Sequence, residues 1–182
     1  VYSPYNRGGD PSGSSTGSAV AVTANFCAAS IGTDTAGSII SPSINNSIIG
    51  FRPSIHSLSN QGIIPISFTL DMIGPMARCV EDVAILYYAM TNSKMVLNKE
   101  QVLKGKIVCL PEGDMVNLSE EETIKIDEIL KALTHAGVII KRMNVTSIET
   151  AKIKIIEKYE FKYIMNKYLK SAGGCCKNDS AG

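Results

Sequence analysis

The alternation of apolar segments and polar turns predicts a chain of short helices and strands. The Ala- and Val-rich run over 18–30 predicts a buried helix of small residues, and residues 31–34 indicate a buried strand that enters a tight turn. Apolar residues at helical spacing predict helices over 80–90 and 151–169. The apolar stripe of the last helix consists of Ile156, Tyr159 and Tyr163.

A strand, a helix and a second strand are predicted in the following part of the chain. Residues 104–110 indicate a turn and a strand, and residues 138–140 form the second strand. Between them, Ser119 and Glu122 have the spacing of a capping box, and Gly137 ends the helix. This order predicts a parallel pair of strands with a right-handed crossover. The helix face expected to be buried consists of Ile126, Ile129, Leu130 and Leu133.

Two clusters of Gly, Ser and Thr stand out in residues 8–50. The first covers 12–18 and the second covers 32–38. A Gly/Ser-rich run is often a flexible linker, but the small-residue run over 19–29 and the strand that follows it argue against a linker here. The clusters therefore indicate two ordered turns that flank a buried element.

The two clusters resemble the signature of the amidase signature family of serine hydrolases, whose pattern is roughly GGSSGGSA, a small-residue helix and then GTDxGGS. The resemblance extends over about residues 5–170, and the runs over 62–67 and 159–169 are similar to the peptide-amidase-like branch. It implies that residues 1–170 are the central part of an amidase signature domain and that 171–182 are a polar tail. The implied fold is α/β, with a mixed β-sheet covered by helices, and the resemblance also implies a short strand at 62–65.

The resemblance implies a Ser–Ser–Lys triad, with Ser38 as the nucleophile and Ser14 as the bridging serine after a cis peptide bond. A serine hydroxyl needs a base to take its proton, and Ser14 would pass the proton of Ser38 to a neutral lysine. In the family that lysine precedes the signature, and no residue of this chain matches it. The chain therefore resembles an internal fragment, which we expect to be inactive in isolation.

The backbone of Thr35, Ala36 and Gly37 matches the family's oxyanion turn, whose N–H groups stabilise the tetrahedral intermediate. Ala36 replaces a usual Gly, and it would be strained if that position required a positive φ. Asp71 and Arg78 match an acidic and a basic position, which we interpret as bracing for the active-site loops, with a partly buried ion pair as the alternative. The supporting residues implied by the resemblance are Ser15, Asp34, Asp71 and Arg78.

Composition adds little to this hypothesis. The chain is 45% apolar, enough for a core, and its net charge of +1 gives no indication of nucleic acid or a membrane surface. No apolar run approaches about 18 residues. The five cysteines contain no CxxC pair, which disfavours a zinc site or a disulfide framework and favours a cytoplasmic protein. We expect no cofactor and no metal, and the expected substrate is a small-molecule or peptide amide.

Several other functions remain as alternatives. A Ser–His–Asp hydrolase would have to use His56 or His135, and neither lies in a hydrolase motif. A phosphate-binding loop at residues 8–18 would lack the GK[ST] ending. Two alternatives stay close to the amidase hypothesis: a fragment similar to the A subunit of a glutamyl-tRNA(Gln) amidotransferase, and an inactive amidase remnant.

Overall fold

The computed structural model describes residues 1–93, 103–112, 118–144 and 150–171. The chain forms two compact units, each described here by itself. The first comprises residues 1–95 together with residues 150–182, and the second comprises residues 96–149.

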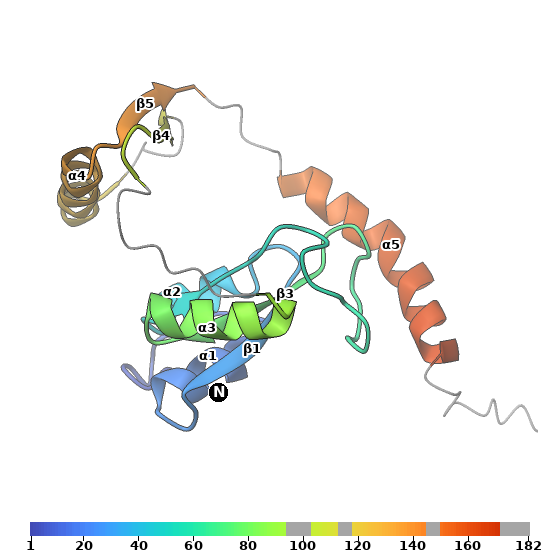
Figure 1. Ribbon diagram of the computed structural model, residues 1–182. Helices are drawn as coiled ribbons and strands as arrows, with labels where there is room; N and C mark the ends of the chain where they lie inside the picture. Colours follow the sequence, from blue (N-terminus) through green and yellow to red (C-terminus); the bar gives the residue numbers. More distant parts are fainter. Residues whose placement is uncertain (94–102, 113–117, 145–149, 172–182) are drawn as a thin grey trace, which may run out of the picture. The chain divides into compact units, whose positions relative to one another are not determined.

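The first unit contains a three-stranded sheet in the order β1-β3-β2, of which β1 and β3 are labelled in Figure 1. The strand β3 (Met72–Ala77) lies at the centre and pairs antiparallel with β1 (Ala29–Asp34) and with β2 (Ile49–Gly50). Its position explains why four successive residues from Gly74 onward are buried. The register pairs Gly32 of β1 with Gly74 of β3, so the two strands meet at their smallest residues.

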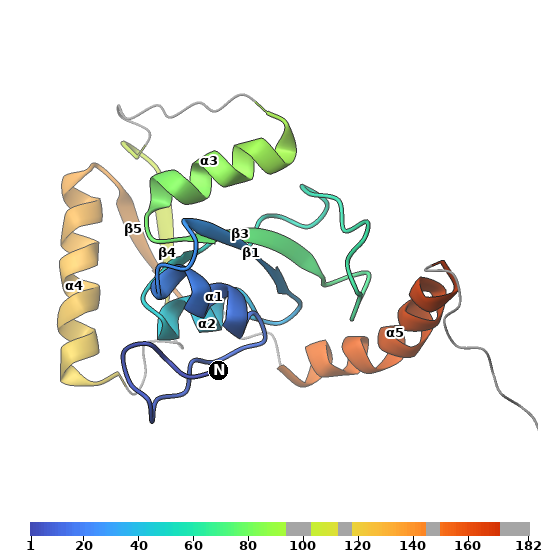
Figure 2. The ribbon, with the colours of Figure 1, turned by 90° about the horizontal axis from the view of Figure 1, so that it is seen from below.

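Helices cover both faces of this sheet. Figure 2 shows α3 (Val80–Thr91) on one face, with α1 (Thr16–Thr23) and α2 (Ile40–Asn45) on the other. Cys79 is the N-cap residue of α3, and its side chain makes no capping hydrogen bond. The core between α1, α2 and the sheet consists of Ala19, Val22, Ile39, Ile48 and Met76, with Cys27 packed against it. The second unit contains a parallel pair of strands. The expected α/β class is confirmed, and within the described residues the antiparallel and parallel pairs belong to two separate sheets.

The predicted extent of the small-residue helix is wrong. The helix ends at Thr23, and Asn25 adopts a left-handed backbone with φ of 59°. Residues 29–34 then join the sheet as β1, where they pair along the whole length of β3. Hydrogen bonds to the distant strand β3 therefore override the helical propensity of Ala29.

The strand predicted at 62–65 is also wrong. Gly62 has a φ of 84°, and the segment forms turns and irregular loop without a strand partner in the described part of the chain. Ile64 is 65% exposed. The apolar residues of this segment lie on the loop between β2 and β3, where they line pockets instead of a sheet face.

The last helix, α5 (Thr150–Ser171), is longer than predicted and presents a different face. Tyr159 and Tyr163 of the predicted stripe are 78% and 64% exposed. The more sheltered side chains include Glu160 and Ile164, which lie on another face of the helix. The rotation of α5 is fixed by hydrogen bonds to Glu160, a polar signal that an apolar stripe does not reveal.

In the second unit, β4 (Ile107–Pro111) and β5 (Ile139–Met143) pair in parallel, as predicted. The helix α4 (Glu120–His135) begins with the predicted capping box, and Gly137 follows it with a φ of 84°. Ile129 is 58% exposed, so its predicted burial is wrong, whereas the other three residues of the predicted face are partly buried. The hand of the crossover stays a prediction. The predicted polar tail after residue 171 lies outside the described residues.

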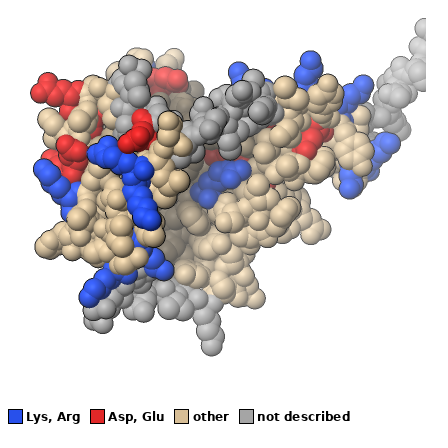
Figure 3. Space-filling view, turned by 90° about the horizontal axis from the view of Figure 1, so that it is seen from above, with Lys and Arg blue, Asp and Glu red and all other residues tan. Residues whose placement is uncertain are grey.

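The surface shown in Figure 3 carries Lys and Arg side chains interspersed with Asp, Glu and uncharged residues. Among the described helices, none combines the length and the apolar character needed to cross a membrane. Within the same residues, no group of three His, Cys, Asp or Glu side chains is placed to hold a metal ion.

Candidate active site

The turn between β1 and α2 is organised by the buried carboxylate of Asp34, which is 1% exposed. Its Oδ1 accepts the N–H of Gly37 at 2.8 Å, and its Oδ2 accepts the N–H of Ile39 at 2.8 Å. The Nε of Arg52 lies 3.1 Å from Oδ1 and completes an ion pair. A buried carboxylate needs such donors to offset its desolvation. Asp34 therefore closes the turn that carries residues 35–38.

The positive φ of this turn falls on glycine and leaves Ala36 unstrained. Gly37 has a φ of 107°, and Ala36 is not among the residues with positive φ. The replacement of a usual Gly by Ala36 is therefore compatible with the turn. The N–H of Gly37 donates to Asp34, so it is not free for the oxyanion role that the resemblance implies. The N–H groups of Ala36 and Ser38 have no acceptor within the described residues.

The first Gly/Ser cluster lies against this turn through Ser15. The N–H of Ser15 donates to the carbonyl of Ser38 at 3.1 Å. Its hydroxyl donates to the carbonyl of Thr33 at 2.9 Å and accepts the N–H of Thr33 at 3.0 Å. These bonds bring Ser14, the preceding residue, beside the backbone of Ser38. The peptide bond between Gly13 and Ser14 is cis, as expected.

Close packing behind the two serines requires a glycine. A Cβ atom at Gly32 would lie 2.8 Å from Sδ of Met76 and 3.0 Å from both Ile39 and the Ser15 hydroxyl. Ser14 is exposed and Ser38 is half-buried. The core side is therefore filled, and the two hydroxyl-bearing residues lie on the outer side of this packing.

Asp71 and Arg78 each make hydrogen bonds to the segments that carry the two Gly/Ser clusters, and their bracing role stays a prediction. The hydroxyl of Thr35 donates to Oδ1 of Asp71 at 2.6 Å. Arg78 donates to the carbonyls of Val22 and Cys27 at 2.9 and 3.0 Å, which fixes the chain after α1. No ion pair joins Asp71 and Arg78 within the described residues, so that alternative is wrong.

Sequence reasoning missed two charged residues. Arg52 pairs with Asp34 and also donates to the carbonyl of Leu70 at 2.8 Å. Glu160 accepts the hydroxyls of Ser67 and Thr69. A single arginine after the apolar run at 48–51 is the signal that could have identified Arg52 as a partner for a buried acid. The signal for Glu160 is a carboxylate on the half-buried side of a helix.

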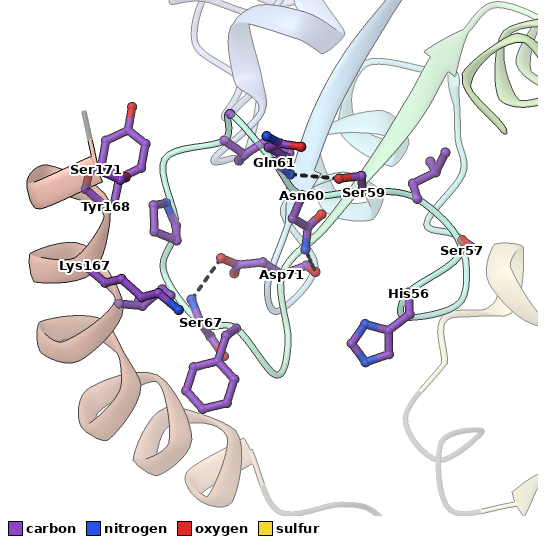
Figure 4. A pocket seen from close by; sticks show the side chains of 16 residues that line it. His56, Ser57, Ser59, Asn60, Gln61, Ser67, Asp71, Lys167, Tyr168 and Ser171 are labelled. Carbon is purple, nitrogen blue, oxygen red and sulfur yellow. Dashed lines mark hydrogen bonds between the residues drawn. The ribbon is translucent and has the colours of Figure 1, made fainter. Parts of the chain in front are cut away.

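A cavity of ≈ 830 Å³ lies between the loop at 56–71 and α5 (Figure 4). Figure 4 shows Asn60, Ser67 and Asp71 on the loop side, with Lys167 and Tyr168 projecting from the helix. Neither Ser14 nor Ser38 lines this cavity. It is connected to the serine turn through Asp71, which also holds Thr35.

The two histidines have no part in a serine–histidine pair within the described residues. His56 lines the cavity and has a φ of 68°, and His135 is the last residue of α4. No hydrogen bond joins either ring to a serine in the part of the chain that the structure describes.

Comparison with known proteins gives a consistent result over almost the whole chain. The family model described as Amidase matches residues 1–179. A probable amidase of Arabidopsis thaliana is 34% identical over 187 residues, covering 92% of this chain and 36% of the relative. The A subunit of the glutamyl-tRNA(Gln) amidotransferase of Chlamydia pneumoniae is 44% identical over 86 residues, covering 47% of this chain and 18% of the relative.

Solved structures agree in fold as well as in sequence. The native peptide amidase of Stenotrophomonas maltophilia superimposes with a TM-score of 0.80 at 30% identity, covering 93% of this chain and 39% of that protein. An amidase family protein of Bacillus anthracis gives 0.76 at 34% identity, covering 93% and 37%. The chain thus spans little more than a third of these relatives, and within that span it belongs to the amidase family.

Proposed function

We propose that this protein hydrolyses a carboxamide C–N bond through an acyl-enzyme on Ser38, with Ser14 as the proton relay. The observation that supports this most directly is the hydrogen bond from the Ser15 N–H to the Ser38 carbonyl, which holds the two Gly/Ser clusters together. Family membership supports the same chemistry.

The reaction has two stages. In the first, Oγ of Ser38 attacks the amide carbonyl while its proton passes to Ser14 and on to a base. The C–N bond then breaks, and the nitrogen leaves as ammonia or an amine with a proton returned by the same relay. In the second, water attacks the ester on Ser38, and the carboxylic acid is released.

The oxyanion of each tetrahedral intermediate would be stabilised by the backbone N–H groups of Ala36 and Ser38. Thr35 and Gly37 contribute differently: Gly37 provides the positive φ and donates to Asp34, and the Thr35 hydroxyl donates to Asp71. Donors fixed before the reaction lower the barrier because they need no reorganisation as charge develops. The final proton acceptor of the relay is the lysine that the family places before the signature.

The nucleophile is tested by covalent labelling of the protein at its full natural length. A fluorophosphonate probe should modify Ser38, and mass spectrometry should locate the adduct there. Ser38→Ala should abolish labelling and amide hydrolysis, whereas Ser41→Ala, an exposed serine in α2, should leave both unchanged. Labelling of another serine, or undiminished labelling of Ser38→Ala, would refute the assignment of Ser38 as the nucleophile. No labelling of the intact wild-type protein would favour an inactive remnant.

A second candidate is an amidotransferase component. It is favoured by the 44% identity to the Chlamydia pneumoniae A subunit over 86 residues. The two functions differ in the acceptor of the released nitrogen. An amidase should release ammonia from simple carboxamides or peptide amides, whereas an amidotransferase component should deliver it to Glu-tRNA(Gln) and should release little without that acceptor.

A further inference from the structure

The carboxylate of Glu160 is held by a loop that lies 91 residues or more away along the chain. Its Oε2 accepts the hydroxyl of Ser67 and the N–H of Thr69, the latter at 3.2 Å. Its Oε1 accepts the hydroxyl of Thr69. All three donors come from the turn before β3, so the loop is fastened to α5 at this point.

Desolvation alone would raise the pKa of Glu160, but the hydrogen bonds from Ser67, Thr69 and the Phe68 N–H outweigh it. The pKa of this carboxyl therefore lies below its usual value, and Glu160 is ionised at neutral pH. A charged acceptor makes stronger hydrogen bonds than a neutral one, which suits a residue that fixes a loop.

The same loop holds Asp71. Ser67 is fully buried, and its hydroxyl also accepts the N–H of Leu70 at 3.1 Å. The backbone N–H groups of Ile66 and Ser67 donate to Oδ2 of Asp71 at 2.7 and 2.9 Å. Figure 4 shows the bond between Ser67 and Asp71 beside the cavity. The position of the Asp71 carboxylate thus depends on the conformation that Ser67 adopts.

Asp71 in turn fixes the first residue of the serine turn. Its Oδ1 accepts the hydroxyl of Thr35 at 2.6 Å, and Asn60 donates to its carbonyl at 2.7 Å. The hydrogen bonds therefore run without a break from Glu160 through Ser67 and Asp71 to Thr35. The residues that follow Thr35 carry the free N–H groups and the Ser38 hydroxyl.

We propose that Glu160 is a positioning residue for the amide hydrolysis, acting through Ser67 and Asp71 to hold the Thr35 end of the oxyanion turn. This inference rests on the proposed function of Ser38. It assigns to α5 a role in setting the geometry of the reaction, in addition to forming one wall of the cavity.

The test compares Glu160→Ala, Glu160→Gln and Thr69→Val in the protein at its full natural length. Glu157→Ala is the matched control, because Glu157 lies on the same helix and makes no hydrogen bond within the described residues. Each variant is titrated with the fluorophosphonate probe, so that kcat is expressed per competent Ser38. Amide exchange of residues 35–38 and 66–71 is measured in parallel, independently of activity.

We expect Glu160→Ala to lower kcat by about tenfold and to change KM little. A tenfold fall in rate corresponds to the free energy of roughly one hydrogen bond. Glu160→Gln keeps one acceptor oxygen but turns an NH₂ group toward the remaining donors and removes the charge, so it should recover only part of this loss. Thr69→Val removes one hydroxyl donor and should also cause a smaller loss than Glu160→Ala. Amide exchange in both segments should increase in Glu160→Ala and stay unchanged in Glu157→Ala.

Three results would overturn the inference: kcat per labelled site equal to that of Glu157→Ala, a raised KM with unchanged kcat, or unaltered exchange at residues 35–38. The wild-type protein separates the two proposals. If it is not labelled at Ser38, the proposed function fails, and the exchange data alone then decide whether Glu160 positions the turn.

Discussion

The carboxylate of Asp34 offers a quantitative test of how the serine turn is held. Oδ1 accepts two donors, from Gly37 and Arg52, and Oδ2 accepts the N–H of Ile39, while the side chain is 0% exposed. Asp34→Asn keeps the shape but presents an NH₂ group to one of these donors and removes the charge opposite Arg52. A hydrogen bond to a charged group contributes about 1.5–3 kcal/mol.

We therefore expect Asp34→Asn to reduce the free energy of unfolding by about 2–4 kcal/mol, and Asp34→Ala by about 3–5 kcal/mol, because Ala leaves Arg52 unpaired. A loss of 3 kcal/mol corresponds to a fall in Tm of roughly 6–12 °C for a protein of about 150–250 residues. Urea unfolding followed by circular dichroism measures the first quantity, and a thermal scan measures the second.

Asp10→Asn is the matched control. Asp10 accepts one N–H, from Ser12 at 2.8 Å, at an exposed site. Asparagine can replace it in such a turn, so the expected change is within about 0.5 kcal/mol. Equal losses for Asp10→Asn and Asp34→Asn, or no loss for Asp34→Asn, would refute the argument that the buried carboxylate organises the turn.

Three further predictions follow from the same structure. Gly32→Ala should lower the free energy of unfolding by about 1–3 kcal/mol, because the added methyl group would lie 2.8–3.0 Å from neighbouring atoms. Gly17→Ala has open space around it in α1 and should raise the free energy of unfolding by up to about 1 kcal/mol. Chemical denaturation of both variants shows whether the two changes have opposite signs. Ser14→Ala should lower kcat by about 10²–10⁴-fold, and a steady-state loss below about tenfold would leave Ser14 as a turn residue only. Hydrogen bonds from the N–H and hydroxyl of Ser119 lower the pKa of Glu122 in the folded protein. The stabilisation of α4 by Glu122 is therefore complete above the unfolded pKa of about 4.3 and is lost as the pH falls through the lower folded pKa. An NMR titration should show a higher pKa of Glu122 in Ser119→Ala than in the wild-type protein.

Local signals in the sequence were sufficient where a few neighbouring residues determine the structure. The capping box of Ser119 and Glu122 and the stop at Gly137 involve residues within one turn of each other. The Gly, Ser and Thr content of the two clusters likewise indicated turns, and in the structure a hydrogen bond joins the two clusters. The capping box and the glycine stop were predicted correctly because no distant partner is needed to specify them.

The remaining features depend on partners far along the chain. Residues 29–34 form a strand because β3 pairs with them, and the register with β3 cannot be read from these residues alone. Arg52 is an ordinary surface cation until Asp34 is placed beside it. Glu160 was hidden for a similar reason, since its donors Ser67 and Thr69 belong to a loop whose predicted strand does not form.

The first unit is interrupted in sequence by the second, and this has a consequence for folding during synthesis. The contact between Thr69 and Glu160 closes a segment of 91 residues, which costs about 4 kcal/mol of chain entropy if the segment is flexible. Residues 96–149 form a compact unit of their own, so folding them first shortens the flexible part of that segment. On a ribosome, the serine turn can therefore assemble early, while its attachment to α5 waits for the inserted unit to emerge and fold.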